Sequence, residues 1–122
     1  MDFVEEGTQR SKHTPTFGYS VTGEDPVVLS ISGEVDLATA RDLSAVLDDL
    51  TLWNRSLVLD LGDVEFMDST GIHVIEKVTA DLQKTGGRLE ISSVSDPVRR
   101  VFELSGMDRV LPLPSAGDPS EG

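Results

Sequence analysis

The stretch of residues 56–82, SLVLDLGDVEFMDSTGIHVIEKVTADL, contains the change of pattern that decides the fold. Residues 57–61 are mostly apolar, which is typical of a short strand covered on both faces. The pair Gly62-Asp63 is expected to break this strand, so that residues 64–67 form a second extended piece. After Gly71 the apolar residues recur at helical spacing, with charged residues between them. The stretch therefore predicts a buried strand, a short loop and an amphipathic helix.

Asp68, Ser69 and Thr70 lie where the predicted strand gives way to the helix. Asp, Ser and Thr are favoured at helix N-caps because their side-chain oxygens accept hydrogen bonds from the first free helix N–H groups. Those groups and the helix dipole also favour an added anion, so the fold would tolerate a phosphoryl group on Ser69 or Thr70. Two interpretations stay open from this pattern: the three residues only cap the helix, or one hydroxyl also accepts a phosphoryl group.

The size and composition of the chain predict one globular domain. It has 122 residues, of which 38% are hydrophobic, and this is enough for a real core. It contains no cysteine, which excludes disulfides and thiolate metal sites. No apolar run reaches the roughly 20 residues of a membrane span, and the N-terminus lacks a signal-peptide pattern. We therefore expect a soluble cytoplasmic protein.

The formal net charge of the chain is −12. Nucleic acids and anionic membrane surfaces attract concentrated positive charge, so neither is expected as a direct partner. An acidic surface suits either attraction to a basic protein partner or simple solubility, and the charge alone does not distinguish these two interpretations.

Apolar patterns in the rest of the chain predict further strands and helices around the central stretch. The expected ranges are 17–21, 27–31, 89–94 and 110–113 for strands, and 40–50 and 98–104 for helices. After an opening hairpin the strands alternate with helices, which predicts parallel pairing and right-handed crossovers. The expected fold class is therefore α/β, with a mixed, mostly parallel sheet of four or five strands and helices packed on it.

Domain boundaries follow from the same patterns. Residues 15–113 are expected to form the domain. Residues 1–14 are polar and unpatterned, which predicts a flexible N-terminal segment. Residues 114–122 combine Gly, Ser, Pro and Asp without apolar partners, which predicts a disordered C-terminal tail.

Three local signals complete the structural prediction. Thr39, with Asp42 three residues later, predicts a capping box at the start of a helix. Asp96 followed by Pro97 predicts an N-cap with proline at the first helical position. Trp53 is interpreted as a packing residue at the edge of the core.

Three ordered stretches together resemble the STAS domain, and specifically its stand-alone bacterial form, the anti-sigma factor antagonist. Residues 32–40, SGEVDLATA, match the family's Gly-Glu-hydrophobic-Asp and Thr-Ala signature. Residues 59–71, LDLGDVEFMDSTG, match its Asp-Ser-Ser/Thr-Gly motif after an apolar strand. Residues 98–110, VRRVFELSGMDRV, match its last helix and turn. The resemblance covers about residues 15–113.

The resemblance implies a switch and not an enzyme. In such proteins the unmodified form binds an anti-sigma factor that is also a serine kinase, and this binding frees the sigma factor. The kinase uses ATP to phosphorylate the serine that follows the Asp, and a serine phosphatase reverses the reaction. Carried onto this chain, the acceptor is Ser69, with Thr70 the less favoured hydroxyl, and no cofactor or metal is implied. The expected partner-binding residues are Asp36, Asp68, Ser69, Thr70, Gly71 and His73.

The expected mechanism is electrostatic and steric. Asp68 is adjacent to the acceptor, and Asp36 or Asp63 is expected nearby in the folded sheet, so the local potential is already negative. A phosphoryl group adds charge and bulk there, and the helix N-terminus is expected to offset part of that charge. A docked partner would then be blocked without a large refolding of the domain.

His73 departs from the family pattern, which usually has a small or flexible residue at this point of the helix. Its charge changes near neutral pH, so one interpretation is that it tunes the site or contributes to the choice of kinase. The other interpretation is an exposed helical residue without a specific role.

An aspartyl-phosphate receiver is the first alternative, because residues 57–60 resemble a strand that ends in an acceptor, Asp60. Such a site needs an acidic pair after the first strand and a lysine after a later strand. The first strand ends in Gly23, and no lysine follows Ile91, so the sequence disfavours this reading.

A hydrolase with Ser69 as nucleophile is the second alternative. It needs a base within reach, and the only histidines are His13 and His73. The Gly-x-Ser-x-Gly nucleophile elbow is absent from the sequence.

Two further alternatives concern metal binding and the role of the fold. A metal site would use the acidic side chains Asp60, Asp63, Glu65 and Asp68, although a solvated loop is the favoured interpretation of these residues. A non-switching STAS subunit of a scaffold or transport complex would keep the fold and change the role.

Overall fold

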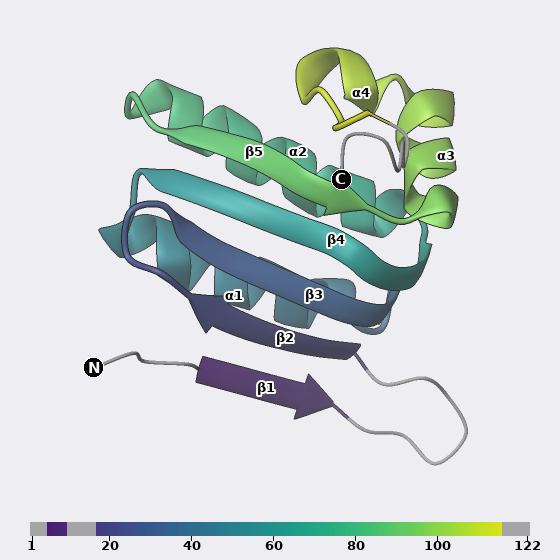
Figure 1. The fold of residues 1–122 in the computed structure, drawn as a ribbon, viewed down its shortest axis with the longest axis horizontal. Helices are drawn as coiled ribbons and strands as arrows, with labels where there is room; N and C mark the ends of the chain where they lie inside the picture. Colours follow the sequence, from purple (N-terminus) through teal and green to yellow (C-terminus); the bar gives the residue numbers. More distant parts are fainter. Residues whose placement is uncertain (1–4, 10–16, 116–122) are drawn as a thin grey trace.

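The computed structural model describes residues 5–9 and 17–115. They form a five-stranded sheet with strand order β1-β2-β3-β4-β5 and helices packed against it (Figure 1). The strands are β1 (Glu5–Gln9), β2 (Phe17–Thr22), β3 (Val27–Val35), β4 (Ser56–Met67) and β5 (Arg88–Val94). The helices are α1 (Ala40–Trp53), α2 (Ser69–Lys84), α3 (Asp96–Ser105) and α4 (Met107–Val110).

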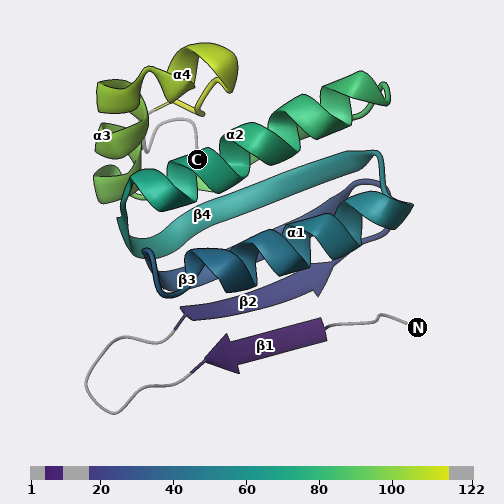
Figure 2. The ribbon, with the colours of Figure 1, turned by 180° about the vertical axis from the view of Figure 1, so that it is seen from behind.

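The sheet is mixed, as predicted. β2 pairs antiparallel with β1 and with β3, whereas β4 pairs parallel with β3 and with β5. The helices α1 and α2 are the crossovers between the parallel strands, and both lie on one face of the sheet (Figure 2). Two right-handed crossovers that advance in the same direction across a sheet place their helices on the same face. The predicted α/β fold is confirmed.

The core lies between this helical layer and the sheet. Alternate residues of β3 and β4 face the helices, and Leu29 and Leu59 are completely buried there. Leu43, Leu47 and Ile75 cover them from α1 and α2 and are also completely buried. Within the described residues no helix covers the opposite face of the sheet (Figure 1). The layering therefore leaves one sheet face open.

β4 is continuous from Ser56 to Met67, so the expected break at Gly62-Asp63 is wrong. The register with β3 shifts between Ser30 and Ser32, which marks a bulge or irregularity at this point and leaves the strand intact. A Cβ atom at Gly62 would lie 2.6 Å from Ser93 Oγ. The glycine therefore serves the close approach of β5 and not a turn, a distinction that its residue type cannot reveal.

The N-terminal segment of residues 1–14 was expected to be flexible, but residues 5–9 form β1. This strand pairs from Glu5 opposite Val21 to Gln9 opposite Phe17. Its sequence, EEGTQ, has no apolar alternation, so hydrophobic patterning could not identify a strand held by backbone pairing. The rest of this segment, and the predicted tail beyond Ser115, lie outside the described residues.

The predicted capping box at the start of α1 is wrong. The helix begins at Ala40, and the Thr39 side chain makes no capping hydrogen bond to it. Thr39 Oγ1 instead donates to the Glu34 carbonyl oxygen at 2.8 Å, back toward the end of β3. Asp42 is a first-turn acidic residue without the predicted partner. The Thr39 hydroxyl therefore bonds to β3 and does not cap α1.

The start of α3 differs from the prediction by one residue. Ser95 is the N-cap, and its Oγ accepts a hydrogen bond from the Val98 N–H at 3.4 Å. The same hydroxyl donates to the Val64 carbonyl oxygen at 2.6 Å, which ties the helix start to β4. Asp96, the predicted cap, is the first helical residue, and Pro97 follows it.

Two apolar segments were also misassigned. Trp53 is 83% exposed at the end of α1, so its expected role as a core-edge packing residue is wrong. The predicted strand at residues 110–113 is wrong as well, because residues 107–110 form α4 and the chain then continues without regular structure to residue 115. Short apolar runs do not carry enough periodicity to separate these outcomes.

Candidate functional site

The site is built where the carboxyl ends of β3 and β4 meet. The Asp68 N–H donates to the Val35 carbonyl oxygen at 3.1 Å, which continues the pairing of the two strands to their last residues. Asp36 follows β3, and Asp68 follows β4, so both carboxylates lie at the same edge of the sheet. The expectation that Asp36 lies near the acceptor motif is therefore confirmed.

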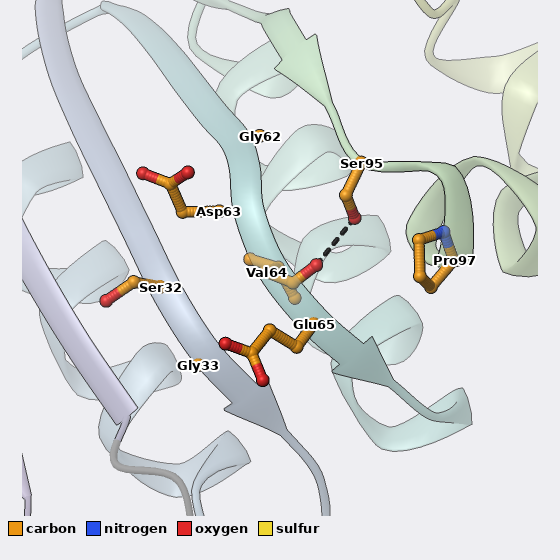
Figure 3. A pocket seen from close by; sticks show the side chains of 8 residues that line it. All are labelled: Ser32, Gly33, Gly62, Asp63, Val64, Glu65, Ser95 and Pro97. Carbon is orange, nitrogen blue, oxygen red and sulfur yellow. Dashed lines mark hydrogen bonds between the residues drawn. The ribbon is translucent and has the colours of Figure 1, made fainter.

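Asp63 does not belong to this edge. It is exposed on the open face of the sheet, where it lines a shallow hollow with Ser32, Glu65 and Ser95 (Figure 3). The carboxylates of Asp63 and Glu65 point into this hollow from β4 (Figure 3). The proposal that Asp63 adds to the potential around the acceptor is not supported by this placement.

Asp68 is the N-cap of α2. Its Oδ1 accepts a hydrogen bond from the Thr70 N–H at 2.9 Å and a second one from the Thr70 hydroxyl. Its carbonyl oxygen accepts from the N–H groups of Gly71 and Ile72 at 3.1 and 3.3 Å. A carboxylate thus already binds the Thr70 N–H at this helix start, and the N–H groups of Gly71 and Ile72 take part in backbone bonds. That the fold tolerates a phosphoryl group on Ser69 or Thr70 stays a prediction.

Ser69 is the first residue of α2, and it is exposed. Its hydroxyl makes no hydrogen bond with any residue that the structure describes, whereas the neighbouring Thr70 hydroxyl is bonded to Asp68. Of the two hydroxyls in the motif, that of Ser69 is therefore the one that another protein can reach without breaking a contact.

Gly71 fixes how closely α2 approaches the sheet. A Cβ atom at this position would lie 2.7 Å from Val35 Cγ1 and 2.8 Å from Met67 Cγ, both closer than real contacts allow. The first turn of the helix can rest on β3 and β4 only because no side chain is present here. The role predicted for Gly71 as a partner-contact residue is not supported, because the residue is buried where α2 packs on the sheet.

The loop after β3 is held by a second set of side-chain bonds. Asp36 Oδ1 accepts from the N–H groups of Ala38 and Thr39 at 3.0 and 3.1 Å. In return, the Asp36 N–H donates to Thr39 Oγ1 at 2.9 Å. Together with the bond from Thr39 to Glu34, these contacts give residues 36–39 one defined conformation. Leu37, inside this loop, extends into solvent.

His73 is exposed one turn beyond Ser69 on the same helix. No hydrogen bond joins it to Ser69 or to a carboxylate among the described residues, so the pair forms no nucleophile–base dyad there. His13, the other histidine weighed as a base, lies outside the described residues. Within the described part, the arrangement that a hydrolase needs is not assembled.

The receiver and metal alternatives also lack their geometry. Asp60 lies within β4, where its Oδ1 accepts from the Gly62 N–H at 3.0 Å, and not at the carboxyl end of a strand where a receiver holds its acceptor. No group of three or more acidic or histidine side chains is arranged to hold a metal ion in residues 5–9 and 17–115. The acidic residues Asp60, Asp63, Glu65 and Asp68 are thus spread over different surroundings.

Two apolar residues near the site escaped the sequence interpretation. Leu37 and Phe66 are both exposed, and each lies within three residues of an acidic residue at the site edge, Asp36 or Asp68. In the sequence, Leu37 stands only within the family motif of residues 32–40, and Phe66 only within the extended piece 64–67 and the motif of residues 59–71. Nothing in their residue type signals exposure, since that depends on the loop and on the strand register.

Among the described helices, none is long and apolar enough to span a membrane.

Comparisons with known proteins find a matching family model and similar sequences. The family model described as "STAS domain" matches residues 20–116. The anti-sigma-B factor antagonist of Bacillus subtilis is 30% identical over 90 residues, covering 74% of this chain and 83% of that protein. The anti-sigma-F factor antagonist of Mycobacterium tuberculosis is 35% identical over 89 residues, covering 70% of each protein.

A solved structure shows the same fold. The crystal structure of an anti-sigma factor antagonist from Mycobacterium paratuberculosis aligns with a TM-score of 0.67 and 23% identity, covering 98% of this chain and 92% of that one. At this identity the similarity concerns the arrangement of strands and helices.

Proposed function

This chain belongs to the STAS domain family and groups with its anti-sigma factor antagonists, and from that premise we propose that it is a phosphorylation-controlled antagonist. Its unphosphorylated form binds an anti-sigma factor that is also a serine kinase, and a sigma factor is thereby released. Phosphorylation of Ser69 weakens this binding, and a serine phosphatase restores it. The observation that carries the proposal is the exposed Ser69 hydroxyl at the sheet edge, which has no hydrogen-bond partner among residues 5–9 and 17–115.

Accessibility favours Ser69 over Thr70 as the acceptor. A kinase must bring the hydroxyl oxygen in line with the γ-phosphoryl group of ATP. The Ser69 hydroxyl is exposed and free within the described structure, whereas the Thr70 hydroxyl is held by the Asp68 carboxylate. Phosphorylation of Thr70 would first have to break the bond between its hydroxyl and the Asp68 carboxylate.

The effect of the phosphoryl group follows from its surroundings. It adds about 1.5 to 2 negative charges at neutral pH. Asp68 already accepts the Thr70 N–H and carries its own charge beside the acceptor, so we expect the helix start to offset only part of the added charge. The added charge therefore stays on the surface, where a docked partner must desolvate or neutralise it. A loss of about 1–3 kcal/mol would weaken binding by roughly 5- to 150-fold without refolding.

The test needs a defined partner. We would use the anti-sigma factor kinase from the same organism that phosphorylates this chain with ATP, and titrate it by calorimetry without ATP. Ser69→Ala should bind as tightly as the unmodified chain, whereas Ser69→Asp and the phosphorylated chain should bind more weakly. Ala80→Asp places the same charge on an exposed position of α2 about 16 Å from the acceptor, and should bind normally. Equal affinity of all forms would refute the switch and favour a non-switching scaffold.

The remaining parts of the proposal follow from this role. The chain acts as substrate and ligand of the kinase and phosphatase and is not itself an enzyme. The sigma factor and ATP place the exchange in the cytoplasm. No direct contact with nucleic acid is part of the proposal, in keeping with the net charge of −12.

A further inference from the structure

The residues around Ser69 are poorly suited to supply the binding energy of a protein complex. Ser69, Thr70 and Gly71 are small, and Gly71 is buried. The carboxylates of Asp36 and Asp68 are already used as acceptors of hydrogen bonds within the chain. In protein interfaces most of the energy comes from a few side chains that fill pockets on the partner. Aromatic anchors are typical among them, whereas Ser and Thr, and also Leu, are under-represented. The anchors of this surface should therefore lie beside the acceptor motif.

Phe66 is one such side chain, and the strand displays it in an unusual way. In regular alternation only one of two consecutive strand residues faces outward. The register between β3 and β4 shifts between Gly33 and Glu34, and both Glu65 and Phe66 are exposed as a result. Phe66 is 46% exposed, three residues before Ser69. The irregularity turns an aromatic ring toward solvent at the edge that carries the acceptor.

Leu37 is the second such side chain. It is 78% exposed in the loop after β3. The hydrogen bonds that Asp36 and Thr39 exchange hold this loop on both sides of Leu37. A loop that is already ordered loses little backbone freedom when a partner binds, which favours affinity.

We propose that Leu37 and Phe66 are the apolar anchors of the docking surface, and that Ser69 acts as its electrostatic gate. This inference rests on the proposed function. The partner that binds this surface is the anti-sigma factor kinase that phosphorylates Ser69. Leu37 follows β3 and Phe66 lies near the end of β4, and the bond from the Asp68 N–H to the Val35 carbonyl oxygen joins these two strand ends at the acceptor motif. Glu34 lies opposite Phe66 in the register, and Glu65 precedes it. The kinase should therefore have an apolar pocket that is surrounded by basic side chains.

The chain provides a matched control at the other end of the sheet. Leu52, near the end of α1, is 74% exposed, close to the exposure of Leu37. Trp53 beside it is a large exposed aromatic residue, as Phe66 is. These two residues lie at the opposite end of the parallel strands from Ser69, so they test whether exposed apolar surface alone accounts for binding.

The experiment compares Leu37→Ser and Phe66→Ser with Leu52→Ser and Trp53→Ser. Each variant of the full chain is titrated with the kinase defined above, and its fold is checked by circular dichroism. We expect each site-end variant to bind at least about tenfold more weakly, and each control variant to stay within about twofold of the unmodified chain. Phosphorylation by the kinase should show a raised KM with little change in kcat for Leu37→Ser.

The outcomes separate this inference from the proposed function. Weakening by Ser69→Asp, with normal binding of both site-end variants, would overturn the anchor assignment and leave the switch intact. Equal weakening by site-end and control variants would also overturn it, because binding would then follow general hydrophobicity. If sedimentation shows that the unmodified chain self-associates and that Leu37→Ser abolishes this, the anchors serve a second copy and the assignment to the kinase is wrong.

Discussion

The two ends of the parallel strands are closed by different kinds of structure. At the carboxyl end, side chains close the loops: Asp36 and Asp68 each accept N–H groups of the following residues. At the amino end, the backbone closes them: Gly87 N–H donates to Leu82 O at 2.7 Å, and Arg88 N–H donates to Arg55 O at 2.8 Å. Both ends expose apolar residues, and the carboxyl end also exposes the Ser69 hydroxyl, which has no hydrogen-bond partner among the described residues. If the proposed function is correct, binding depends on how these side chains are placed and not on exposed apolar area alone.

The largest effect should come from filling the contact beneath Gly71. Gly71→Val would force a side chain between α2 and the ends of β3 and β4, and should lower the free energy of unfolding by about 3 kcal/mol. At the other end, Gly86 has a φ of +80° and open space around its Cβ position. Gly86→Asn should cost less than about 1 kcal/mol, because Asn tolerates left-handed backbone. Urea denaturation measures both, and an equal loss would show that the two ends are packed alike.

The next effect concerns the loop that displays Leu37. Asp36→Ala removes the acceptor of two backbone N–H groups and should lower the free energy of unfolding by about 2 kcal/mol. Asn54→Ala, at the far end of α1, removes one bond to the Leu50 carbonyl oxygen and should cost about 1 kcal/mol or less. The same urea titrations apply. A smaller loss for Asp36→Ala than for Asn54→Ala would contradict the view that side chains define the site end.

A smaller difference is expected between the start and the end of α2. Asp68→Ala removes the N-cap and should lower the free energy of unfolding by about 1 kcal/mol. Thr85→Ala removes an exposed hydroxyl that bonds to Leu82 O at the other end, and should cost only a few tenths of a kcal/mol. Chemical denaturation of the two variants under identical conditions decides this. A normal midpoint for Asp68→Ala would remove the capping role on which the site description depends.

The smallest effect on stability is expected for the ion pair between Lys77 and Asp81 on α2. The hydrogen bond at 2.9 Å to exposed Lys77 lowers the pKa of Asp81, and the same bond raises the pKa of Lys77. The Asp81 contribution is complete above its ordinary pKa of 3.8 and is lost as pH falls through the lowered value. The Lys77 contribution is complete below 10.5 and is lost as pH rises through the raised value.

Stability near neutral pH should therefore hardly change in Lys77→Ala, and the change should vanish in about 1 M salt. Thermal unfolding at low and high salt measures it. A loss that persists at high salt would mean that Lys77 contributes through packing and not through charge.

Residues with one dominant local preference were predicted correctly. The apolar patterns of 17–21 and 27–31 and the helical spacing after Gly71 correspond to β2, the first part of β3 and α2. The candidate acceptor motif was also placed correctly at the start of α2. In these segments the burial pattern of the fold repeats the periodicity of the sequence, so local analysis was sufficient.

Residues with two available uses were predicted poorly. Thr39 has the side chain of a helix cap but bonds to Glu34, and Gly62 has the signature of a turn but lies inside β4. Trp53 is apolar but exposed. In each case the role of the residue depends on whether a residue distant in the sequence lies close to it in the fold. A single sequence does not show which residues come together.

The amino-acid sequence by itself determined the order of strands and helices from β2 to α3 and the position of Ser69 at a strand-to-helix junction. It could do so because periodicity and capping preference act over a few neighbouring residues. Only the tertiary structure decided which hydroxyl is free, that Asp36 and not Asp63 joins the site edge, and that Leu37 and Phe66 face solvent. Those features depend on strand register and on close contact between β3, β4 and α2, which bring together groups that the sequence separates.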